Sequence, residues 1–456
     1  MRAILAICLA MSAAACGGKN NADDDGDGGQ RPDACVGIEC DVVDCGKMSL
    51  PPTSISGKVF APNGTLPLNG VNVYVPREAL PAFVEGATCD RCATTLPGSP
   101  VVQTVSDAHG NFKLDNVPAG SNIPLVITTG KWRRQVTIPT VASCGDNAIG
   151  AADTSLPKSR AEGDIPKIAI TTGSADTMEC LVRKLGLADS EISPSGDARI
   201  HLYAGNGVDK LKNGFAGGSN ASLNGAQAFW DSFDNLKAYD IVILSCEGSQ
   251  VGGTPKSQGA LDAMKQYSDI GGRVFASHWH NIWIGGRFQG GTNPTQATWA
   301  PIATWTAADS DPGDPILIDE VANPKGGLFA EWMLDPMVGG STVRDQIALA
   351  DEAGGGTTGR RTATTLDVAR GERWVKTSTG DSPQMFQFTT PVEVANDQRC
   401  GKVVFTDMHV SGQSDNQNGD YPDNCLGGAN NLTLTPQEKA LAFMFFDIAG
   451  CVGGIF

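Results

Sequence analysis

The sequence has no stretch in which lysine and arginine residues gather among aromatic ones. Lys and Arg together number 34 against 50 Asp and Glu, so the chain of 456 residues has a formal net charge of -16. A protein that binds nucleic acid needs a basic face, because binding depends on releasing the counterions that surround the phosphates. The composition therefore argues against nucleic acid as a partner.

Long apolar runs are also missing. No segment approaches the roughly 20 consecutive apolar residues that a membrane-spanning helix needs. The N-terminus instead reads MRAILAICLAMSAAAC, with a basic second residue, a short apolar run and three alanines before a cysteine. This order is typical of an export signal.

Residues 1–15 resemble the signal peptide of a bacterial lipoprotein. The resemblance implies that Cys16 becomes the first residue of the mature chain and carries the lipid that anchors it to the membrane. Gly17 follows Cys16, and in diderm lipoproteins a residue other than aspartate at this place favours the outer membrane. An ordinary secretory signal cut nearby is the alternative, and both place the mature protein outside the cytoplasm.

Thirteen cysteines are many for a chain of this length. Export implies an oxidising compartment, in which most of them are expected to pair as disulfides. Eleven remain once Cys8 is removed and Cys16 is lipidated, and an odd number leaves at least one free. A zinc site at Cys89, Cys92 and Cys144 is the alternative, although it lacks a second close pair of ligands.

Composition and periodicity divide the chain into successive segments. Residues 16–52 form an acidic tether with a cysteine-rich end, and residues 53–141 contain short runs of period two separated by turn residues, which predicts a small all-β sandwich. A linker over 142–164 leads to residues 165–456, with a long insertion at about 284–380. Continuously apolar strands alternate there with helices, which predicts an α/β, flavodoxin-like domain with a mostly parallel sheet.

The end of the chain carries a clear helix start. Thr435-Pro436-Gln437-Glu438 combines a side-chain cap, a proline in the first turn and a glutamate three residues after the cap. These residues predict a capping box at the beginning of a final helix.

Two sequence patterns in the β-rich part resemble a known family. SISGKVFAPNGTLPLNGVNVYV and TVSDAHGNFKLDNVPAGSNIPLVI are similar to the carboxypeptidase regulatory-like domain, which has a transthyretin-like fold. The matching residues of the second pattern are Asp107, Gly110, Phe112, Leu114, Val117, Pro118 and Gly120. The resemblance implies a non-catalytic spacer or a module that presents a ligand.

The α/β part resembles the class I glutamine amidotransferase-like superfamily, and more narrowly its trehalose-utilisation branch. In this branch a glycine pair ends a helix and a histidine follows the next strand, as Gly271, Gly272 and His278 do here. A late strand in this chain approximates another pattern of the branch with Gly401, Lys402, Val403, Phe405, Thr406 and His409. Glutaminase activity in this superfamily depends on a cysteine flanked by two glycines. This chain lacks that pattern, since Ser277 lies at the corresponding place between Ala276 and His278. The resemblance therefore implies a fold rather than an activity.

Polar residues follow several of the predicted strands. In an open parallel sheet, ligands bind beyond the carboxyl ends of the strands. The candidate residues at these ends are Ser174, Cys246, Glu247, Ser277, His278, Trp279, His280, Asp407 and His409. They include three of the five histidines of the chain.

Three interpretations of these residues stay open. In the first, Ser277 or Cys246 is a nucleophile that His409 activates, with Asp407 or Glu247 orienting the imidazole. In the second, a divalent metal is bound by three nitrogens and a carboxylate oxygen, from His278, His280 and His409 with Asp407 or Glu247.

In the third interpretation, the same region is a non-catalytic cleft. Trp279 and Trp283 would stack on a sugar, with His278, His280, Ser174 and Glu247 as polar partners. We favour this third one, which predicts a lipoprotein that binds a ligand, carbohydrate or another envelope component. A hydrolase acting on a glycan, an ester or an amide is the alternative.

Two acidic segments offer oxygen ligands for calcium. They contain Asp309, Asp311 and Asp314, and Asp415, Asn416, Asn418, Asp420 and Asp423. Neither matches the ligand spacing of a known calcium loop, and polar loop chemistry explains both equally well.

The lipid anchor can be tested directly. Replacing Cys16 with serine removes the thiol that would carry the lipid, so the Cys16→Ser protein should leave the membrane fraction. Fractionation and mass spectrometry of the N-terminal peptide measure this. An unmodified N-terminus in a wild-type protein that still fractionates with membranes would show that the anchor lies elsewhere.

Overall fold

The computed structural model describes residue 35 and residues 37–92, 95–289, 295–299, 301–350, 359–410, 419–425 and 430–453. The segment predicted as a signal peptide, Cys16 and most of the predicted tether lie outside these residues. Gly37–Phe456 form one compact unit, which is rich in strands that belong to several sheets, some of them mixed. Among the described residues, no helix combines the length and apolar character needed to cross a membrane.

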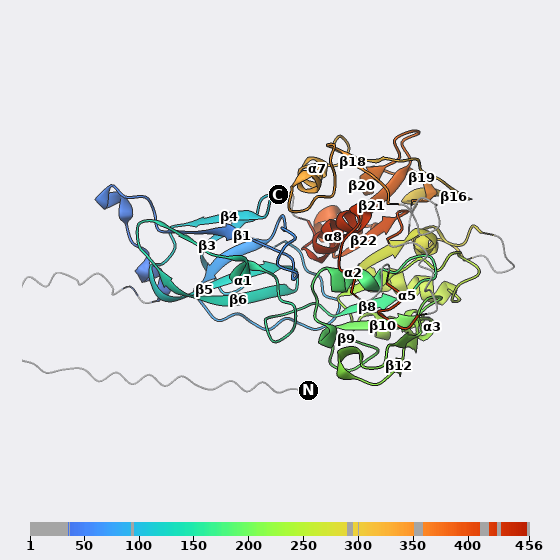
Figure 1. Cartoon of the computed structure of the whole chain (residues 1–456). Coiled ribbons are helices and arrows are strands. Elements are labelled where there is room, and N and C mark those ends of the chain that lie inside the picture. Colours follow the sequence, from blue (N-terminus) through green and yellow to red (C-terminus); the bar gives the residue numbers. More distant parts are fainter. Residues whose placement is uncertain are drawn as a thin grey trace, which may run out of the picture. The chain divides into compact units, whose positions relative to one another are not determined.

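The N-terminal strands form two sheets (Figure 1). Along β4, Phe112 and Leu114 are buried while Lys113 between them is exposed, which is the period-two pattern of a strand with one solvated face. Leu114 shares one core cluster with Val73 and Leu125 of the other sheet. One sheet has the strand order β4 (Asn111–Asp115), β1 (Ser54–Lys58), β7 (Asp146–Ala148). The other has the strand order β3 (Pro100–Val105), β2 (Asn72–Pro76), β5 (Gly120–Thr129), β6 (Trp132–Val141).

A large mixed sheet occupies the rest of the chain. Its first half is parallel and contains β13 (Asn224–Gly225), β10 (Ile200–Ala204), β8 (Ile168–Thr171), β14 (Ile241–Leu244), β15 (Arg273–Ser277) and β22 (Gly401–Thr406), with β9 (Ile192–Ser193) beside β10. Its second half is antiparallel and contains β21 (Pro383–Thr390), β20 (Gly371–Lys376), β17 (Ile316–Ile318) and β18 (Gln346–Ile347). The predicted insertion at 284–380 therefore supplies three strands of this sheet.

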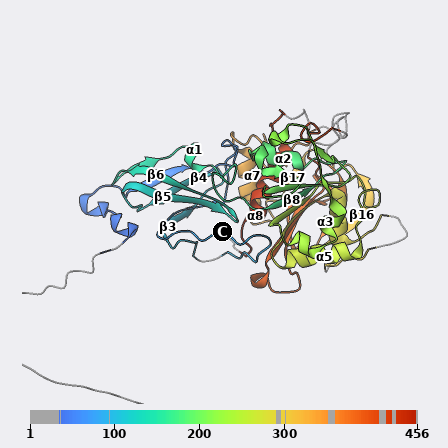
Figure 2. The same cartoon turned by 90° about the horizontal axis from the view of Figure 1, so that it is seen from below.

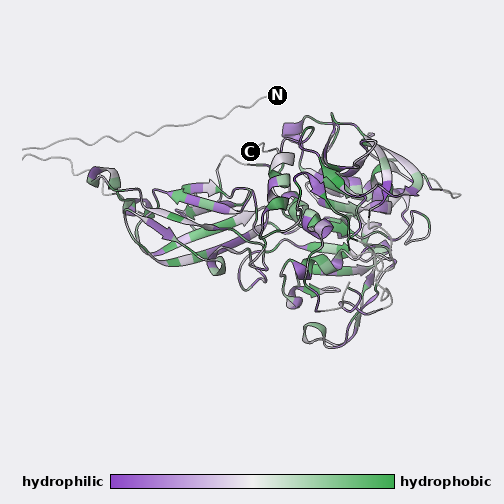
Figure 3. Cartoon of the chain, turned by 45° about the horizontal axis from the view of Figure 1, so that its top comes forward, coloured by the Kyte–Doolittle hydropathy of each residue, from purple (hydrophilic) through white to green (hydrophobic). Residues whose placement is uncertain are grey.

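Both faces of the parallel half are covered. Ile241 and Ile243 of β14 belong to one core cluster, and Val242 and Leu244 belong to the other. Successive side chains of a strand point to opposite faces, so a strand buried on both sides is apolar throughout. Hydrophobic residues accordingly gather in these strands (Figure 3).

The helices divide between the two faces (Figure 2). One core cluster contains residues of α2 (Glu179–Lys184), α7 (Gly326–Leu334) and α8 (Pro436–Ala449). The other contains residues of α3 (Ala226–Trp230), α4 (Phe233–Leu236), α5 (Gln258–Asp269) and α6 (Ile282–Gly285). Between α5 and β15 the backbone of Gly271 has φ +119°, and a β-carbon there would lie 2.1 Å from the Thr88 carbonyl oxygen. This turn therefore requires glycine.

Shorter elements complete the chain. The strands β16 (Ala303–Ser310) and β19 (Arg361–Leu366) form a separate two-stranded antiparallel sheet. The remaining elements are β11 (Lys210–Leu211), β12 (Ala221–Ser222), α1 (Ala151–Thr154) and the 3-10 turns Ile38–Asp41, Cys45–Met48, Asp189–Glu191, Phe215–Gly217, His278–Asn281 and Asn396–Gln398.

The prediction that most cysteines form disulfides is confirmed. The pairs are Cys45–Cys144, Cys89–Cys400, Cys92–Cys451 and Cys180–Cys425, and Cys35 and Cys40 are disulfide-bonded as well. The zinc alternative at Cys89, Cys92 and Cys144 was wrong, because the three sulfurs belong to three different disulfides. Cys246 is free and buried, as the odd number of cysteines predicts.

The segment predicted as a linker, residues 142–164, contains β7 and α1, and its Leu156 is buried. Cys89–Cys400 and Cys92–Cys451 also join the loop before β3 to the C-terminal part of the chain. The boundaries of the domains stay predictions.

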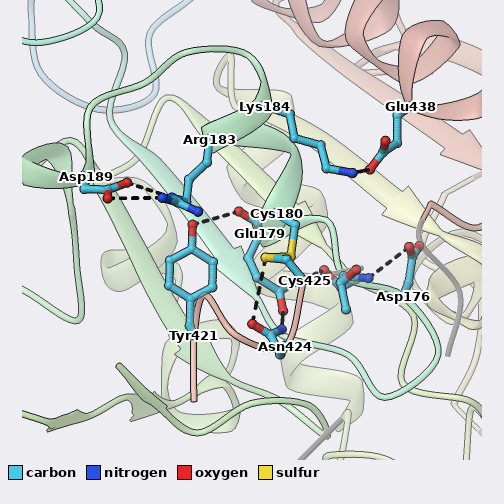
Figure 4. Close-up of a disulfide and its surroundings, with 12 residues drawn as sticks. Asp176, Glu179, Cys180, Arg183, Lys184, Asp189, Tyr421, Asn424, Cys425 and Glu438 are labelled. Carbon is cyan, nitrogen blue, oxygen red and sulfur yellow. Dashed lines mark hydrogen bonds and ion pairs between the residues drawn. A yellow bond between two sulfur atoms is a disulfide. The ribbon is translucent and has the colours of Figure 1, made fainter. Parts of the chain in front are cut away.

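A buried ion pair joins α2 to α8 (Figure 4). The Lys184 Nζ lies 2.6 Å from Glu438 Oε1, and the two side chains are 1% and 0% exposed. The predicted capping box is confirmed, since Glu438 also accepts a hydrogen bond from the Thr435 backbone N–H and the Thr435 side chain accepts one from that of Glu438. One carboxylate thus fixes the start of α8 and its contact with α2.

Lys184→Met should destabilise the fold by about 3–5 kcal/mol, because it leaves the Glu438 carboxylate buried without its partner charge. Adding Glu438→Gln removes that charge. The free energy of unfolding of the double variant should therefore fall by much less than the sum of the decreases in the two single variants. Denaturant unfolding of the four proteins measures the coupling. Equal stability of Lys184→Met and wild type would contradict the buried pair.

A second prediction concerns His109, whose Nδ1 lies 2.6 Å from Asp335 Oδ2 and whose Nε2 lies 3.0 Å from Glu331 Oε1. The hydrogen bond to Asp335, with the charges of Asp335, Glu331 and Asp107, raises the pKa of His109 against a smaller effect of burial. A raised pKa stabilises the folded state below the unfolded pKa of about 6.5, and this contribution is lost as the pH rises through the folded pKa. The difference in Tm between wild type and His109→Gln should therefore shrink as the pH rises, and a constant difference would refute this.

Candidate functional site

The candidate site lies where three neighbouring parallel strands end. The register pairs Leu244 of β14 with Ala276 of β15, and Cys246 and His278 each follow these residues by two positions. On the other side, Ser277 of β15 pairs with Thr406 of β22, three residues before His409. Neighbouring strands lie about 4.8 Å apart. The register therefore brings a thiol and two imidazoles to one edge of the sheet.

Cys246, His278 and His409 form a tight buried cluster. Nδ1 of His278 lies 3.3 Å from the Cys246 Sγ and 2.9 Å from Nε2 of His409. One ligand atom from each of the three residues lies within 4.8 Å of those of the other two. The three residues are 0%, 1% and 3% exposed, respectively.

His278 has an unusual backbone. Its φ is +45°, a region that non-glycine residues rarely adopt, and the 3-10 turn His278–Asn281 begins with it. Such a conformation costs about 1–3 kcal/mol and is found most often at active sites and ligand sites. The strand therefore ends abruptly at the residue that contacts both Cys246 and His409.

Asp309 of β16 lies on the other side of the His278 ring. Its Oδ1 is 3.3 Å from Nε2 of His278 and 3.6 Å from Nε of Arg360. Burial tends to lower the pKa of His278, but the charge of Cys246 and the contacts with Asp309 raise it to about 10. The positive charge of His278 in turn lowers the pKa of Asp309 against the effect of burial. The His278 ring thus lies between the Cys246 sulfur on one side and the Asp309 carboxylate on the other.

His409 differs from His278 in charge. Burial, and next the positive charges of His278 and Arg360, lower its pKa well below the ordinary value. A neutral imidazole offers one nitrogen with a free lone pair. His409 is therefore an electron-pair donor towards His278, not a competing cation.

His280 does not join the cluster. Its Nε2–H donates to the Ser245 carbonyl oxygen at 2.7 Å, and its Nδ1 accepts from the Trp283 Nε1–H at 2.9 Å. Both nitrogens are used by the fold. The Trp279 and Trp283 side chains are also buried, at 3% and 0% exposure, so neither ring offers a stacking surface in this structure.

Ser277 contacts a carboxylate rather than a histidine. Its hydroxyl donates to Asp176 Oδ2 at 2.5 Å, and Asp176 Oδ1 accepts from the Val410 N–H at 2.9 Å. Burial raises the pKa of Asp176 to about 7, although these hydrogen bonds oppose it. Asp176 thus holds the two residues that adjoin His278 and His409 in the chain.

Asp407 and Glu247, which the sequence offers as partners of His409, have other partners. Asp407 accepts hydrogen bonds from both the N–H and the hydroxyl of Thr362 and from the N–H of Ala363, and burial raises its pKa to about 6. Glu247 forms a buried ion pair with Lys256. The Ser174 hydroxyl donates to the Glu247 carbonyl oxygen at 3.1 Å.

The sequence did not identify Asp309 as the carboxylate that contacts His278. Asp309 was considered there only as a calcium ligand, together with Asp311 and Asp314. In the structure, the Asp311 side chain accepts a hydrogen bond from the Gly313 N–H, and the Asp314 side chain accepts one from the Leu349 N–H. In the other acidic segment, Asp423 pairs with Lys212, and residues 415–418 lie outside the described part. Asp309 belongs to an insertion whose pairing with the sheet has no signal in the sequence.

Comparison with known proteins adds little. No family model matches the chain, and no curated protein matches it. Two solved complexes of mutant type II cohesin with X-dockerin from Acetivibrio cellulolyticus are 16% and 17% identical, each over 27% of this chain and over 76% and 78% of their own, both with a TM-score of 0.16. A cytoplasmic protein of Salmonella typhimurium is 13% identical over 62% of this chain and 99% of its own, with a TM-score of 0.30. Scores this low carry no argument about fold or function.

Proposed function

We propose that this chain is an envelope lipoprotein whose C-terminal part hydrolyses an ester or an amide. Cys246 is the nucleophile, His278 its acid–base partner, and Asp309 orients the imidazole. The observation that carries the proposal is the row of contacts from Sγ to Nδ1 at 3.3 Å and from Nε2 to the carboxylate at 3.3 Å. A nucleophile, a base within reach and a third group that orients the base are what thiol catalysis requires.

The chemistry proceeds in two halves. The Cys246 thiolate attacks the carbonyl carbon, and the His278 imidazolium gives its proton to the departing alcohol or amine, which leaves an acyl thioester. A water molecule then attacks the thioester carbonyl and gives a proton to His278. The acid departs, and the thiolate–imidazolium pair is restored.

Two observations support this cysteine over the serine candidate. The Ser277 hydroxyl donates to Asp176, so no histidine accepts its proton. The sulfur of Cys246 additionally accepts the N–H of Gly248 at 3.4 Å, which stabilises negative charge on it. Both favour Cys246 as the reacting group.

The other parts of the proposal come from the sequence. The export signal and the pairing of most cysteines support a place in an oxidising envelope. We propose that the two N-terminal sheets form a transthyretin-like sandwich that spaces or presents the second part. The parallel strands with helices on both faces support a flavodoxin-like, amidotransferase-like fold for that part, with the antiparallel strands as an extension.

Cys246→Ala should lower turnover of activated esters and amides by at least about a thousandfold, because the acyl thioester can no longer form. Ser277→Ala, the matched change at the rival nucleophile, should retain turnover within a few-fold. A panel of chromogenic esters and peptide anilides measures both, with intact-protein mass spectrometry to detect the acyl group on Cys246. Loss of turnover in Ser277→Ala but not in Cys246→Ala would reverse the assignment.

A further inference from the structure

We infer that Cys246, His278 and His409 bind a divalent transition metal of the zinc class, and that the bound metal silences the thiol. Zinc binding itself does not depend on the proposed hydrolysis, whereas the silencing rests on Cys246 being the reactive group. The mechanism above uses Cys246, His278 and Asp309. It gives no role to His409, although Nε2 of that ring lies 2.9 Å from Nδ1 of His278.

The first argument is the number of protons available. Nδ1 of His278 faces two groups at once, the Cys246 sulfur and Nε2 of His409. If Nδ1 carries a proton, two electron-pair donors share it, and if it does not, its one lone pair meets two neighbours. A divalent cation in place of that proton satisfies all three atoms together.

The second argument is the spacing of the donor atoms. Zinc binds thiolate sulfur at about 2.3 Å and imidazole nitrogen at about 2.0–2.1 Å, which in a tetrahedron separates two nitrogens by about 3.3 Å and a sulfur from a nitrogen by about 3.6 Å. From His278 Nδ1 the present separations are 2.9 Å to His409 Nε2 and 3.3 Å to the Cys246 sulfur, and each of these two needs to widen by only a few tenths of an ångström. Ligand atoms of all three residues lie within 4.8 Å of one another.

The third argument is the surroundings of the ligands. A histidine that binds a metal usually directs its other nitrogen to a carboxylate, which fixes the ring. Asp309 lies 3.3 Å from the Nε2 of His278, the nitrogen that faces away from the other two donors. Asp176 holds the residues next to both histidines. The donor set is therefore supported on each side before any metal binds.

Binding has a balanced consequence for the thiol. The metal takes the sulfur lone pair that would attack a carbonyl, and the protons that the cluster held go to solvent. The loaded protein has no nucleophile at Cys246. Removing the metal restores it.

The experiment uses the mature protein after treatment with a chelator. Titration with Zn²⁺, followed by desalting and elemental analysis, should give one zinc per chain. Co²⁺ in place of zinc should give the charge-transfer absorption of a thiolate ligand. Iodoacetamide should alkylate Cys246 in the metal-free protein at least tenfold faster than in the zinc-loaded protein.

His409→Ala and His409→Gln should lose the stoichiometric zinc, and added Zn²⁺ should no longer slow the alkylation of Cys246 in either variant. His280→Gln is the matched control, since it changes a buried histidine two residues from His278 that does not reach the cluster. It should retain the zinc. Circular dichroism and thermal melts show whether each variant is folded. Two different changes at His409 are made so that the test still stands if one of them prevents folding.

The outcomes separate this inference from the proposed function. Stoichiometric zinc with a cobalt–thiolate band, but no hydrolysis by the metal-free protein, would leave the metal site standing and remove the hydrolase. No stoichiometric zinc in the wild type, or equal zinc in wild type and both His409 variants, would overturn the metal site whatever the hydrolysis assay gives. Zinc that binds and accelerates turnover would overturn the silencing.

Discussion

The hydrogen-bond register of three parallel strands is the constraint on which the candidate site depends. β14, β15 and β22 lie side by side, and the pairings of Leu244 with Ala276 and of Ser277 with Thr406 fix how far each strand reaches. A shift of one residue in a strand would turn its side chains to the opposite face. Because each face of these strands packs into its own core, such a shift would place every side chain against the core that was shaped for its neighbours. The cores thus keep the thiol and the imidazoles together.

The strand ends also bury polar groups, which is costly unless each has a partner. Asp176 accepts hydrogen bonds from Ser277 of β15 and from Val410, and Asp407 accepts them from two residues of β19. Burial still raises the pKa of each carboxyl group, to about 7 for Asp176 and about 6 for Asp407. Lys256 with Glu247 and Lys184 with Glu438 place opposite charges in contact. This support explains how the backbone of His278 can hold a positive φ, because the neighbouring residues are fixed independently.

The disulfides act on a larger scale. The four pairs Cys45–Cys144, Cys89–Cys400, Cys92–Cys451 and Cys180–Cys425 have sequence separations from 99 to 359 residues, so each of them joins distant parts of the chain. Long loops of this kind restrict the unfolded chain most in the loop-entropy account of disulfide stability. Cys246 is left out of this pairing, and its nearest polar neighbours are an imidazole and a backbone N–H. A reduced thiol in a chain otherwise rich in disulfides is consistent with a role in chemistry or metal binding, both of which need a free sulfur.

The sequence by itself determined the local features. Alternating apolar residues give the β-strands of the N-terminal part, continuous apolar runs give the parallel strands, and Thr435 to Glu438 give the capped helix, because each depends on residues close together in the chain. It also placed Cys246, His278 and His409 at strand ends, and the odd number of cysteines required a free one. Only the tertiary structure decided which of these residues meet. From the sequence, His409 was paired with Asp407, and His280 was grouped with the metal ligands. In the structure, the folding of the insertion brings Asp309 to His278. Strand register and the turn at His278 direct His280 and Asp407 to other partners. Those contacts join residues 31 to 131 positions apart, and no local pattern encodes which strand lies beside which.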